Sequence, residues 1–423
     1  MLQALFILLL FLGLAGQAAA QVGAPALSRL SLREAEALLA TKNRELQVAR
    51  RAVEAAEATT LSAGQRPNPT LSLNTINISP RTGIGSGNLR DKAVDSTIRL
   101  DQVIERGNKR ELRVSAAKIL ETASGEDLAD TLRQQRLALR GAYYDVLLAQ
   151  DKASVVAETA ELFKRAQQAA ELRLKAGDIS GADVARLRVD VLRALNDLQS
   201  AEADRRRAQL ALAYIIGAER QAEDIKAVDA WPAPQRTELI NLDEMIERRP
   251  DVRGARARIE AAVKAREVAR SLRTRDFSVG VQYEHFPDIA GNSSNTFGFG
   301  VSIPLFTRYY YEGEIAQAES AYNSAIDNLE RVRALARGEV GKALSDVTAS
   351  AERLARYQES LLSEAKKSAD SAEFAYKNGA IGVMDLLDAR RTLRAIQLDA
   401  ATAQADYAKA LAAWQLGSLQ GGE

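Results

Sequence analysis

The sequence has no cysteine, a single histidine and only three methionines among its 423 residues. The lack of cysteine excludes disulfide bonds, thiolate metal sites, cysteine nucleophiles and a lipid anchor on an N-terminal cysteine. With so few histidine and thioether side chains, we expect no dedicated metal site and no cofactor. The sequence also lacks a visible Ser/His/Asp set, a pocketed carboxylate pair and a phosphate-binding loop, so it supplies no chemistry for an enzyme.

The sequence is also poor in aromatic residues and has no large excess of either charge. The 57 lysines and arginines are balanced by 56 aspartates and glutamates, so the composition does not point to nucleic acid as a partner. Aromatic residues make up only 5% of the chain, and alanine dominates the apolar residues. This composition favours long, closely packed helices over a core of bulky side chains.

Long apolar runs are confined to the N-terminus. Residues 5–14 form an uncharged apolar run that is too short to span a bilayer, and it leads into the small residues Ala18, Ala19 and Ala20. We therefore predict that residues 1–20 are a signal peptide and that the chain is exported. No later segment is a candidate for a transmembrane helix.

The rest of the chain is a tandem repeat. Shifting the sequence against itself by about 202 to 206 positions aligns it almost from end to end. Residues 45–56 match residues 251–262, and "AYIIG" at 213–217 matches "AWQLG" at 413–417. We predict a first repeat at 21–217, an inter-repeat connection at 218–243, a second repeat at 244–417 and a short tail at 418–423.

Each repeat is expected to contain a helix, a strand pair, a very long helix, a corner and another long helix. The longest predicted helix covers residues 108–176, which include no proline. Apolar or small residues recur in it at a spacing of seven, which is typical of a coiled-coil seam. The two lines of the seam are Leu132, Leu139, Val146, Ala153 and Ala160, and Ala142, Ala149, Val156, Phe163 and Ala170.

The predicted strands of the second repeat alternate cleanly between apolar and polar residues. Phe277, Val279, Val281 and Tyr283 point to one side of their strand, and the residues between them are polar or glycine. Residues 297–303 alternate in the same way. The first-repeat strands, 70–78 and 96–104, are weaker, and the pattern changes phase at 75–76 as at a β-bulge. Polar loops are expected at 79–92 and 287–295.

Four strands cannot close a barrel by themselves, and an open edge would leave unsatisfied backbone groups in lipid. Two arrangements follow: a small soluble sheet, or strands pooled by several chains. Export, the alternation and the polar loops favour pooling.

Two further features lie at the ends of the second-repeat strands. His285 extends the apolar face of its strand, where we expect an interfacial side chain and not a metal ligand. Arg308–Tyr311 is expected to pack at the junction between strand and helix.

Five stretches together resemble the TolC-like outer-membrane efflux proteins, and within them the CzcC/CusC-like branch that works with heavy-metal RND pumps. They are "RPNPTLSL" (66–73), "QVIERGNKR" (102–110), "RPDVRGARARIEAA" (249–262), "VSIPLF" (301–306) and "YKNGAIGVMDLLDARR" (376–391). The resemblance implies a mainly α fold with a small β part. Three protomers would each donate four transmembrane strands to a twelve-strand β-barrel and two long coiled-coil hairpins to a periplasmic α-barrel.

The resemblance also implies a location and partners. The chain would lie in the outer membrane of a Gram-negative bacterium as a homotrimer, with a large periplasmic part. It would contact a periplasmic adaptor, an inner-membrane RND pump and outer-membrane lipid, and would passively export heavy-metal cations. A drug or small-molecule duct of the same family is one alternative. A soluble periplasmic coiled-coil binding scaffold is another, from a different class.

The corner between the long helices occurs twice, because the stretch at 174–189 is echoed at 376–391. We predict that Gly177 and Gly379 are left-handed residues that end a helix, and that the next helix starts near the aspartate that follows. As the resemblance also implies, the corners would meet at the periplasmic mouth and contact the adaptor. The predicted docking residues are Gly177, Asp178, Ser180 and Gly181 in the first corner and Gly379, Ala380 and Gly382 in the second.

Acidic residues follow both corners. Asp385 and Asp388 are three residues apart and share a helical face. In the family, aspartates at these motif positions form rings that narrow the periplasmic entrance; the alternative is two solvated acids near a helix N-terminus. The first repeat keeps Asp183 but has Arg186 where Asp388 would lie. We predict that Arg186 binds an acid of the neighbouring hairpin and holds the mouth shut.

Overall fold

The computed structural model describes residues 27–81, 83–84, 94–235, 241–287 and 293–418. The predicted signal peptide, most of the predicted loop at 79–92 and nearly all of the tail lie outside the described residues. The chain divides into two compact units. Unit 1 contains the described parts of Met1–Arg44, Gln135–Thr237 and Ser345–Ala413, and unit 2 those of Glu45–Gln134, Glu238–Leu344 and Trp414–Glu423.

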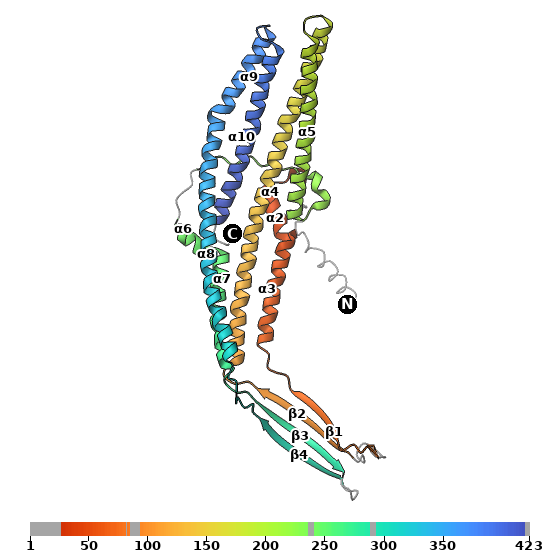
Figure 1. Cartoon of the computed structure of the whole chain (residues 1–423), viewed down its shortest axis with the longest axis vertical. Helices are drawn as coiled ribbons and strands as arrows, with labels where there is room; N and C mark the ends of the chain where they lie inside the picture. The colour runs from red at the N-terminus through yellow and green to blue at the C-terminus, as the bar shows by residue number, and fades with distance from the viewer. Residues whose placement is uncertain (1–26, 82, 85–93, 236–240, 288–292, 419–423) are drawn as a thin grey trace, which may run out of the picture. The chain divides into compact units, whose positions relative to one another are not determined.

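Helices account for most of the described chain (Figure 1). They are α2 (Leu32–Lys42), α3 (Arg44–Ala63), α4 (Lys109–Lys175), α5 (Gly181–Ile216), α6 (Leu242–Arg248), α7 (Pro250–Ser271), α8 (Glu312–Arg356), α9 (Leu362–Lys377) and α10 (Val383–Ser418). A π-helical turn at Tyr357–Leu361 joins α8 to α9, and short 3₁₀ helices lie at Leu27–Arg29 and Glu219–Asp224. Helix α4 confirms the long helix predicted at 108–176.

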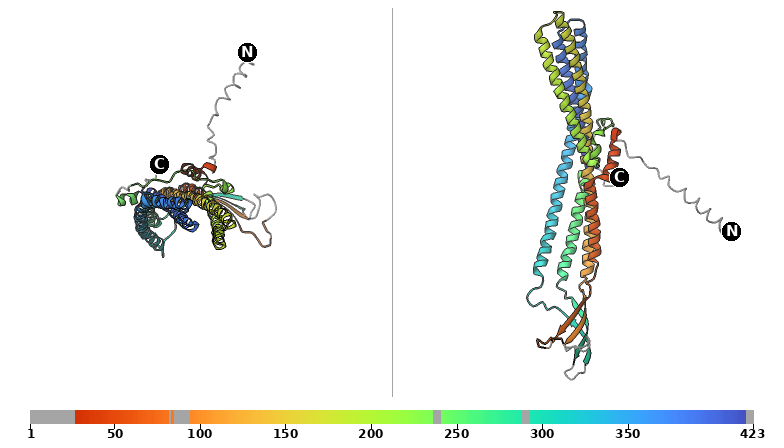
Figure 2. Two further views of the ribbon diagram at one scale, coloured as in Figure 1. Left: turned by 90° about the horizontal axis from the view of Figure 1, so that it is seen from above. Right: turned by 90° about the vertical axis from the view of Figure 1, so that its right-hand side faces the viewer.

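The predicted seam of α4 is buried along nearly its whole length. All of its residues from Leu139 and Ala142 onward are at most 9% exposed, and only Leu132 is half-buried. In unit 1 this seam continues into a core that combines Phe163 of α4, Leu187 of α5 and Leu387 of α10. The hairpin made by α4 and α5 therefore packs against the hairpin made by α9 and α10 at the corner end, where Figure 2 shows them side by side.

The four strands form one antiparallel sheet in the order β1-β2-β3-β4 (Figures 1 and 2). They are β1 (Thr70–Ile76), β2 (Asp95–Ile104), β3 (Phe277–Pro287) and β4 (Ser293–Ser302). The predicted bulge is wrong, because the β1–β2 register continues without interruption to Ile76, which pairs with Asp95. The predicted loop at 287–295 was too long, since β3 extends to Pro287 and β4 begins at Ser293.

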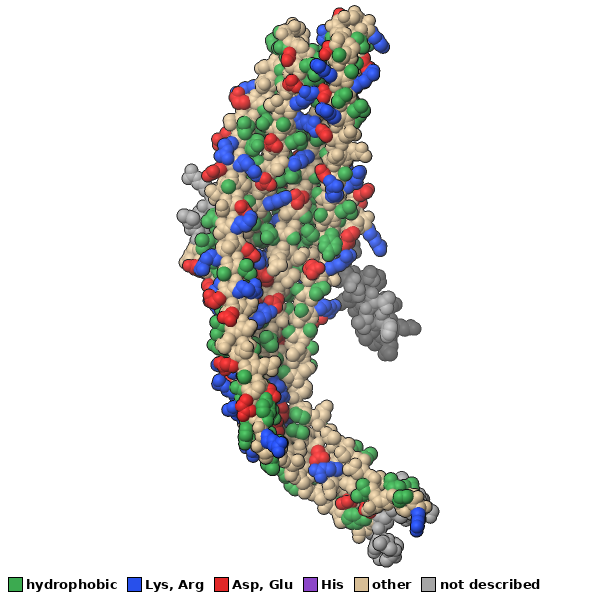
Figure 3. All heavy atoms as spheres, in the orientation of Figure 1, with side chains coloured by type: hydrophobic (Ala, Val, Ile, Leu, Met, Phe, Trp, Pro, Cys, Tyr) green, Lys and Arg blue, Asp and Glu red, His purple; other side chains and the backbone are tan. Residues whose placement is uncertain are grey.

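The sheet has one apolar and one polar face. The alternation and the register place ten apolar residues on the same side: Leu71, Leu73, Ile98, Leu100, Val279, Val281, Tyr283, Phe297, Phe299 and Val301. Many of them are exposed in the single chain, including Phe297 at 84% and Phe299 at 73%. The view in Figure 3 shows few charged side chains over the strands and many over the helices. Such an exposed apolar surface requires a cover of lipid or protein.

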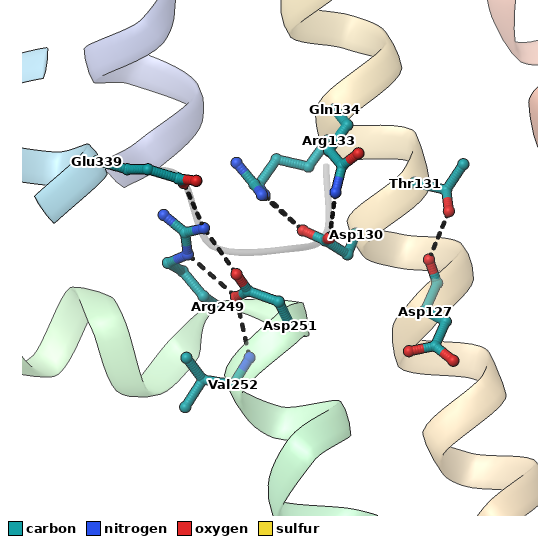
Figure 4. Close-up of polar contacts among 9 residues, drawn as sticks. All are labelled: Asp127, Asp130, Thr131, Arg133, Gln134, Arg249, Asp251, Val252 and Glu339. Carbon is teal, nitrogen blue, oxygen red and sulfur yellow. Dashed lines mark hydrogen bonds and ion pairs between the residues drawn. The ribbon is translucent and has the colours of Figure 1, made fainter. Parts of the chain in front are cut away.

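A buried arginine organises the start of α7 in unit 2 (Figure 4). Arg249 precedes Pro250, the first residue of the helix, and its side chain is only 4% exposed. Its guanidinium donates to both carboxylate oxygens of Asp251, at 3.0 and 2.7 Å, and to Glu339 of α8 at 2.8 Å. The Asp251 carboxylate also accepts from the Val252 backbone at 2.9 Å. The ion pair thus joins the N-terminus of α7 to α8.

Two buried tyrosines hold the connection between the repeats in unit 1. The hydroxyl of Tyr143 lies 2.9 Å from the Leu30 carbonyl and 2.9 Å from the Asp229 carboxylate. The hydroxyl of Tyr407 accepts from the Gln235 backbone at 2.9 Å and donates to the Ala233 carbonyl at 3.2 Å. Burial raises the pKa of Tyr143, so the phenol remains a neutral hydrogen-bonding group.

Candidate channel mouth at the hairpin corners

The two corners have the same backbone conformation. Gly177 and Gly379 adopt left-handed φ angles of 84° and 73°, as predicted from the sequence. After Gly177, the Asp178 amide donates to the Arg173 carbonyl at 2.9 Å; after Gly379, the Ala380 amide donates to the Ala375 carbonyl at 2.8 Å. A hydrogen bond from an amide to the carbonyl group five residues earlier is typical of a Schellman motif, which ends a helix by satisfying its last carbonyl groups.

The next helix begins in a related way in both repeats. Ser180 is the N-cap of α5, and its hydroxyl oxygen accepts from the Asp183 amide at 3.2 Å and donates to the Asp183 carboxylate at 2.8 Å. In the second corner the Asp385 carboxylate accepts from the Gly382 amide at 3.2 Å. Asp183 and Asp385 therefore each contact the N-terminus of their own helix, where a negative charge is stabilised.

Each hairpin is closed by an equivalent ion pair. Arg188 of α5 binds Glu171 of α4 at 3.2 Å, and Arg390 of α10 binds Glu373 of α9. Both glutamates have a pKa below the ordinary value. For Glu171 the main cause is the hydrogen bond from Gln167, followed by that from Arg188, and for Glu373 it is the hydrogen bond from Lys377. These contacts repeat with the sequence and do not distinguish the two corners.

The corners differ in the charges that link one hairpin to the other. Arg391 of α10 binds Asp190 of α5 at 2.5 Å and also binds Asp388 of its own helix at 2.5 Å. One turn further along, Arg394 of α10 binds Asp197 of α5 at 2.7 Å. In these two ion pairs, α10 supplies the cations and α5 the acids that connect the hairpins.

Arg186 does not make this connection inside the chain. Its side chain is exposed, and in the described part of the chain it has no ion-pair partner. Sequence reasoning missed the pair of Arg391 and Asp190. The available signal was Asp190 itself, because this aspartate lies three residues after Leu187 on the buried face of α5 and is 9% exposed. A carboxylate at such a position requires a cation.

The predicted docking residues of both corners are exposed. Gly177, Asp178, Ser180, Gly181, Gly379, Ala380 and Gly382 all lie on the surface of the single chain. A Cβ atom built on Gly181 meets no atom within 4 Å, and one on Gly382 meets only the Asp385 carboxylate at 3.6 Å. Both glycines therefore have room for a Cβ atom, unlike Gly177 and Gly379, whose left-handed φ angles restrict substitution whatever the space.

The sequence matches the outer membrane efflux protein family over residues 37–218 and 241–416. This chain belongs to that family. The efflux protein is 28% identical over 371 residues to the cobalt-zinc-cadmium resistance protein CzcC of Cupriavidus metallidurans. The alignment covers 86% of this chain and 84% of CzcC.

Solved structures show the same fold. The outer membrane protein VceC of Vibrio cholerae matches with a TM-score of 0.72 and 18% identity, over 92% of the efflux protein and 96% of VceC. The structure of CusC matches with a TM-score of 0.73 and 17% identity, over 91% of each chain. The predicted fold class, mainly α with a small β part, is confirmed, as is the resemblance to the CzcC/CusC-like branch.

Membership of the family fixes the general role and location of the efflux protein. It is an outer membrane efflux channel with a large periplasmic part, from a family of channels and not of enzymes. In the described residues, no helix has a stretch that is both long and apolar enough to cross a membrane. Also within the described residues, histidines and acids do not gather into groups of three or more that could hold a metal ion. His285 lies 2.8 Å from the side-chain oxygen of Asn295.

Proposed function

We propose that the efflux protein is a homotrimeric exit duct that passively releases heavy-metal cations, delivered through a periplasmic adaptor by an inner-membrane RND pump. Each repeat, 21–217 and 244–417, supplies one strand pair and one helical hairpin, joined through 218–243. Outer-membrane lipid surrounds the strands, and the hairpin corners lie at the periplasmic mouth.

The structure of the sheet supports assembly into a trimer. Strands β1 and β4 each have one neighbour in the sheet, so both edges are open in the single chain. One face of the same sheet is apolar and exposed. In lipid, each edge strand must pair with another strand, because its backbone groups would otherwise lack hydrogen-bond partners. Three chains joined edge to edge would satisfy every strand, place the apolar face against lipid and leave the polar face around an aqueous lumen.

The substrate class is supported by similarity to CzcC, whose name refers to cobalt, zinc and cadmium resistance, across most of both chains. The chemistry of the second corner agrees with it. Asp385 and Asp388 are both exposed, and threefold symmetry would bring six carboxylates together. Crowded carboxylates attract cations and favour their passage. Arg391 offsets part of the charge of Asp388.

Tolerance to metals tests the substrate class. In a strain that lacks the efflux protein, we expect loss of tolerance to zinc, cobalt or cadmium and its return with the wild-type gene. Tolerance to organic antibiotics and detergents is measured in the same strains. Loss confined to these organic compounds would reject metal cations and identify a drug or small-molecule duct. A protein released with the soluble periplasm, without detergent, would instead support the scaffold alternative.

The mouth is tested by electrical recording. We propose that Asp385 and Asp388 form its acidic rings, and that the exposed Arg186 and the Asp183 beside it face the neighbouring protomer. The double variant D385N/D388N should reduce the selectivity for cations and the block by multivalent cations added from the periplasmic side. Unchanged selectivity and block would leave Asp385 as a residue at the helix N-terminus and Asp388 as an ion-pair partner of Arg391, without a role in selectivity.

Contact with the adaptor is tested at the two uncrowded glycines. Because both glycines are exposed and have room for a Cβ atom, G181W and G382W should leave the trimer in the outer membrane but abolish efflux. Lys175→Ala removes an exposed charge from the same corner and should have a mild effect. If both tryptophan variants export normally, the docking surface lies elsewhere.

A further inference from the structure

The polar face of the sheet has an unequal charge content. Alternation and register place Asp95, Asp101 and Glu284 on this face together with Arg99. In the four strands that the structure describes, Arg99 is the only cationic residue on this side, against three carboxylates. A surface of this kind favours cations, provided that the guanidinium does not reach into the solution.

Arg99 is held along the sheet by two side chains. Its Nε donates to Asp101 Oδ2 at 2.7 Å and its Nη2 donates to Asp101 Oδ1 at 2.8 Å. Its remaining terminal nitrogen, Nη1, donates to Gln282 Oε1 on β3 at 3.0 Å. The pairing with Asp101 is bidentate, which fixes the plane of the guanidinium as well as its position. The side chains of Arg99 and Asp101 are 33% and 25% exposed.

Three glycines on β3 and β4 make room for this cluster. A Cβ atom on Gly280 would overlap the Asp101 carboxylate, and one on Gly298 would lie 2.9 Å from the Gln282 side chain. A Cβ atom on Gly300 would lie 3.4 Å from Arg99 Nη2. Glycine weakens a strand interior, and it is found where another group must approach the backbone closely. Here the approaching groups are the three side chains of the cluster.

We propose that Asp101 determines ion selectivity in the strand-lined part of the duct: it neutralises Arg99 and, with Gln282 and the three glycines, holds it flat against the wall so that hydrated cations pass. This inference rests on the proposed function, because the polar face borders a lumen only when the sheets of three chains close. Without Asp101, the Arg99 side chain of each of the three chains would keep only its hydrogen bond to Gln282, and its charge at the lumen would be uncompensated.

Two variants that change the net charge equally should differ in their effect on ion selectivity. D101N and D95N each remove one carboxylate per chain from the same face, but only D101N removes the charge that pairs with Arg99. Asp95 instead accepts from Asn77 at the other end of β2. The double variant R99Q/D101N has the same net charge as the wild type and has no arginine to release. It should therefore behave like the wild type.

The experiment is the reversal potential of the purified trimer in planar bilayers under a potassium chloride gradient. We expect a cation-selective wild type, a fall of the cation-to-anion permeability ratio by about twofold or more in D101N, and a smaller fall in D95N. R99Q/D101N should restore the wild-type ratio. G280A changes no charge but displaces the Asp101 carboxylate, so it should shift the ratio in the direction of D101N. Survival of the trimer on a native gel shows that each variant has assembled.

Three results would overturn the inference: equal shifts in D101N and D95N, a double variant that is not restored, or a wild-type pore without preference for cations. Each leaves a trimeric duct standing. If the purified protein forms no pores, the proposed function fails together with this inference. The same series in the D385N/D388N background separates the sheet from the mouth, because the effect of D101N should persist there.

Discussion

Arg249 and Arg391 make the same kind of contact in two regions of the molecule. Each guanidinium binds two carboxylates, one close in sequence and one from another long helix: Arg249 binds Asp251 and Glu339, and Arg391 binds Asp388 and Asp190. Their exposure differs tenfold, because the Arg249 side chain is 4% exposed and that of Arg391 is 40% exposed. The two contacts have the same pattern, but the free energy that is lost when each is broken should differ.

Water accounts for the difference. Removing one member of a buried pair leaves an uncompensated charge in a poorly solvated place and costs several kcal/mol. An exposed pair is screened by water and salt, so it contributes at most about 1 kcal/mol. Arg249 therefore acts as a fixed part of the helix packing at the start of α7. The Arg391 guanidinium is largely open to water, although its partner Asp190 is only 9% exposed. This contact should therefore cost less to break than that of Arg249, which suits the proposed opening of the mouth.

Replacing Arg249 should have the largest effect. We expect R249M to lower the free energy of unfolding by about 3 kcal/mol, because Asp251 would lose the cation that compensates its burial. Urea unfolding of the detergent-solubilised protein, followed by circular dichroism, measures the change. R248M is the matched control, since the neighbouring Arg248 is 51% exposed and binds the exposed Glu244. Equal losses in the two variants would contradict a special role for the buried pair.

The second largest effect on stability should come from acid, which weakens the ion pair of Arg249 and Asp251. Burial by itself raises the pKa of Asp251, but the hydrogen bonds and attraction of Arg249, with a smaller contribution from Arg133, bring the pKa below its ordinary value of 3.8. A carboxyl group whose pKa is lowered by folding stabilises the protein above the ordinary pKa, and this contribution disappears as the pH falls through the folded value.

Unfolding midpoints measured from about pH 5 to pH 3 test this sign. The wild type should lose more stability over this range than D251N, in which the titrating group is absent. Parallel curves for the two proteins would place the acid sensitivity elsewhere.

Replacing Arg391 should have the smallest effect on stability and a visible effect on the mouth. R391Q removes the cation between the hairpins but leaves an amide that can donate to the buried Asp190. We expect the free energy of unfolding to fall by about 1 kcal/mol, less than in R249M, and the single-channel conductance in bilayers to rise. R390Q is the control, because Arg390 closes its own hairpin through Glu373 and does not bind α5. If R390Q raises the conductance as much as R391Q, loosening of one hairpin and not the link between them controls the mouth.

Sequence reasoning succeeded where local chemistry decides the structure. Gly177 and Gly379 were predictable because a left-handed residue that ends a helix favours glycine, and the α4 seam because its spacing of seven requires a partner helix. The link between Arg391 and Asp190 was not predictable in this way, because many charged residues compete for partners on exposed helix faces. Ile76 led to an incorrect bulge, because it is an apolar residue on the polar face at the last position of β1.

The register of the sheet also sets an order of events during biogenesis. Ile98 of β2 pairs with Tyr283 of β3, and the whole hairpin of α4 and α5 lies between them in the chain. Local helical contacts form quickly, whereas pairing between distant segments is slow. Each hairpin can thus fold as it emerges in the periplasm, but the central strand pair must wait for the second repeat. Until then Ile98 and Leu100 of β2 lack the neighbouring strand β3, which leaves this apolar segment prone to aggregation.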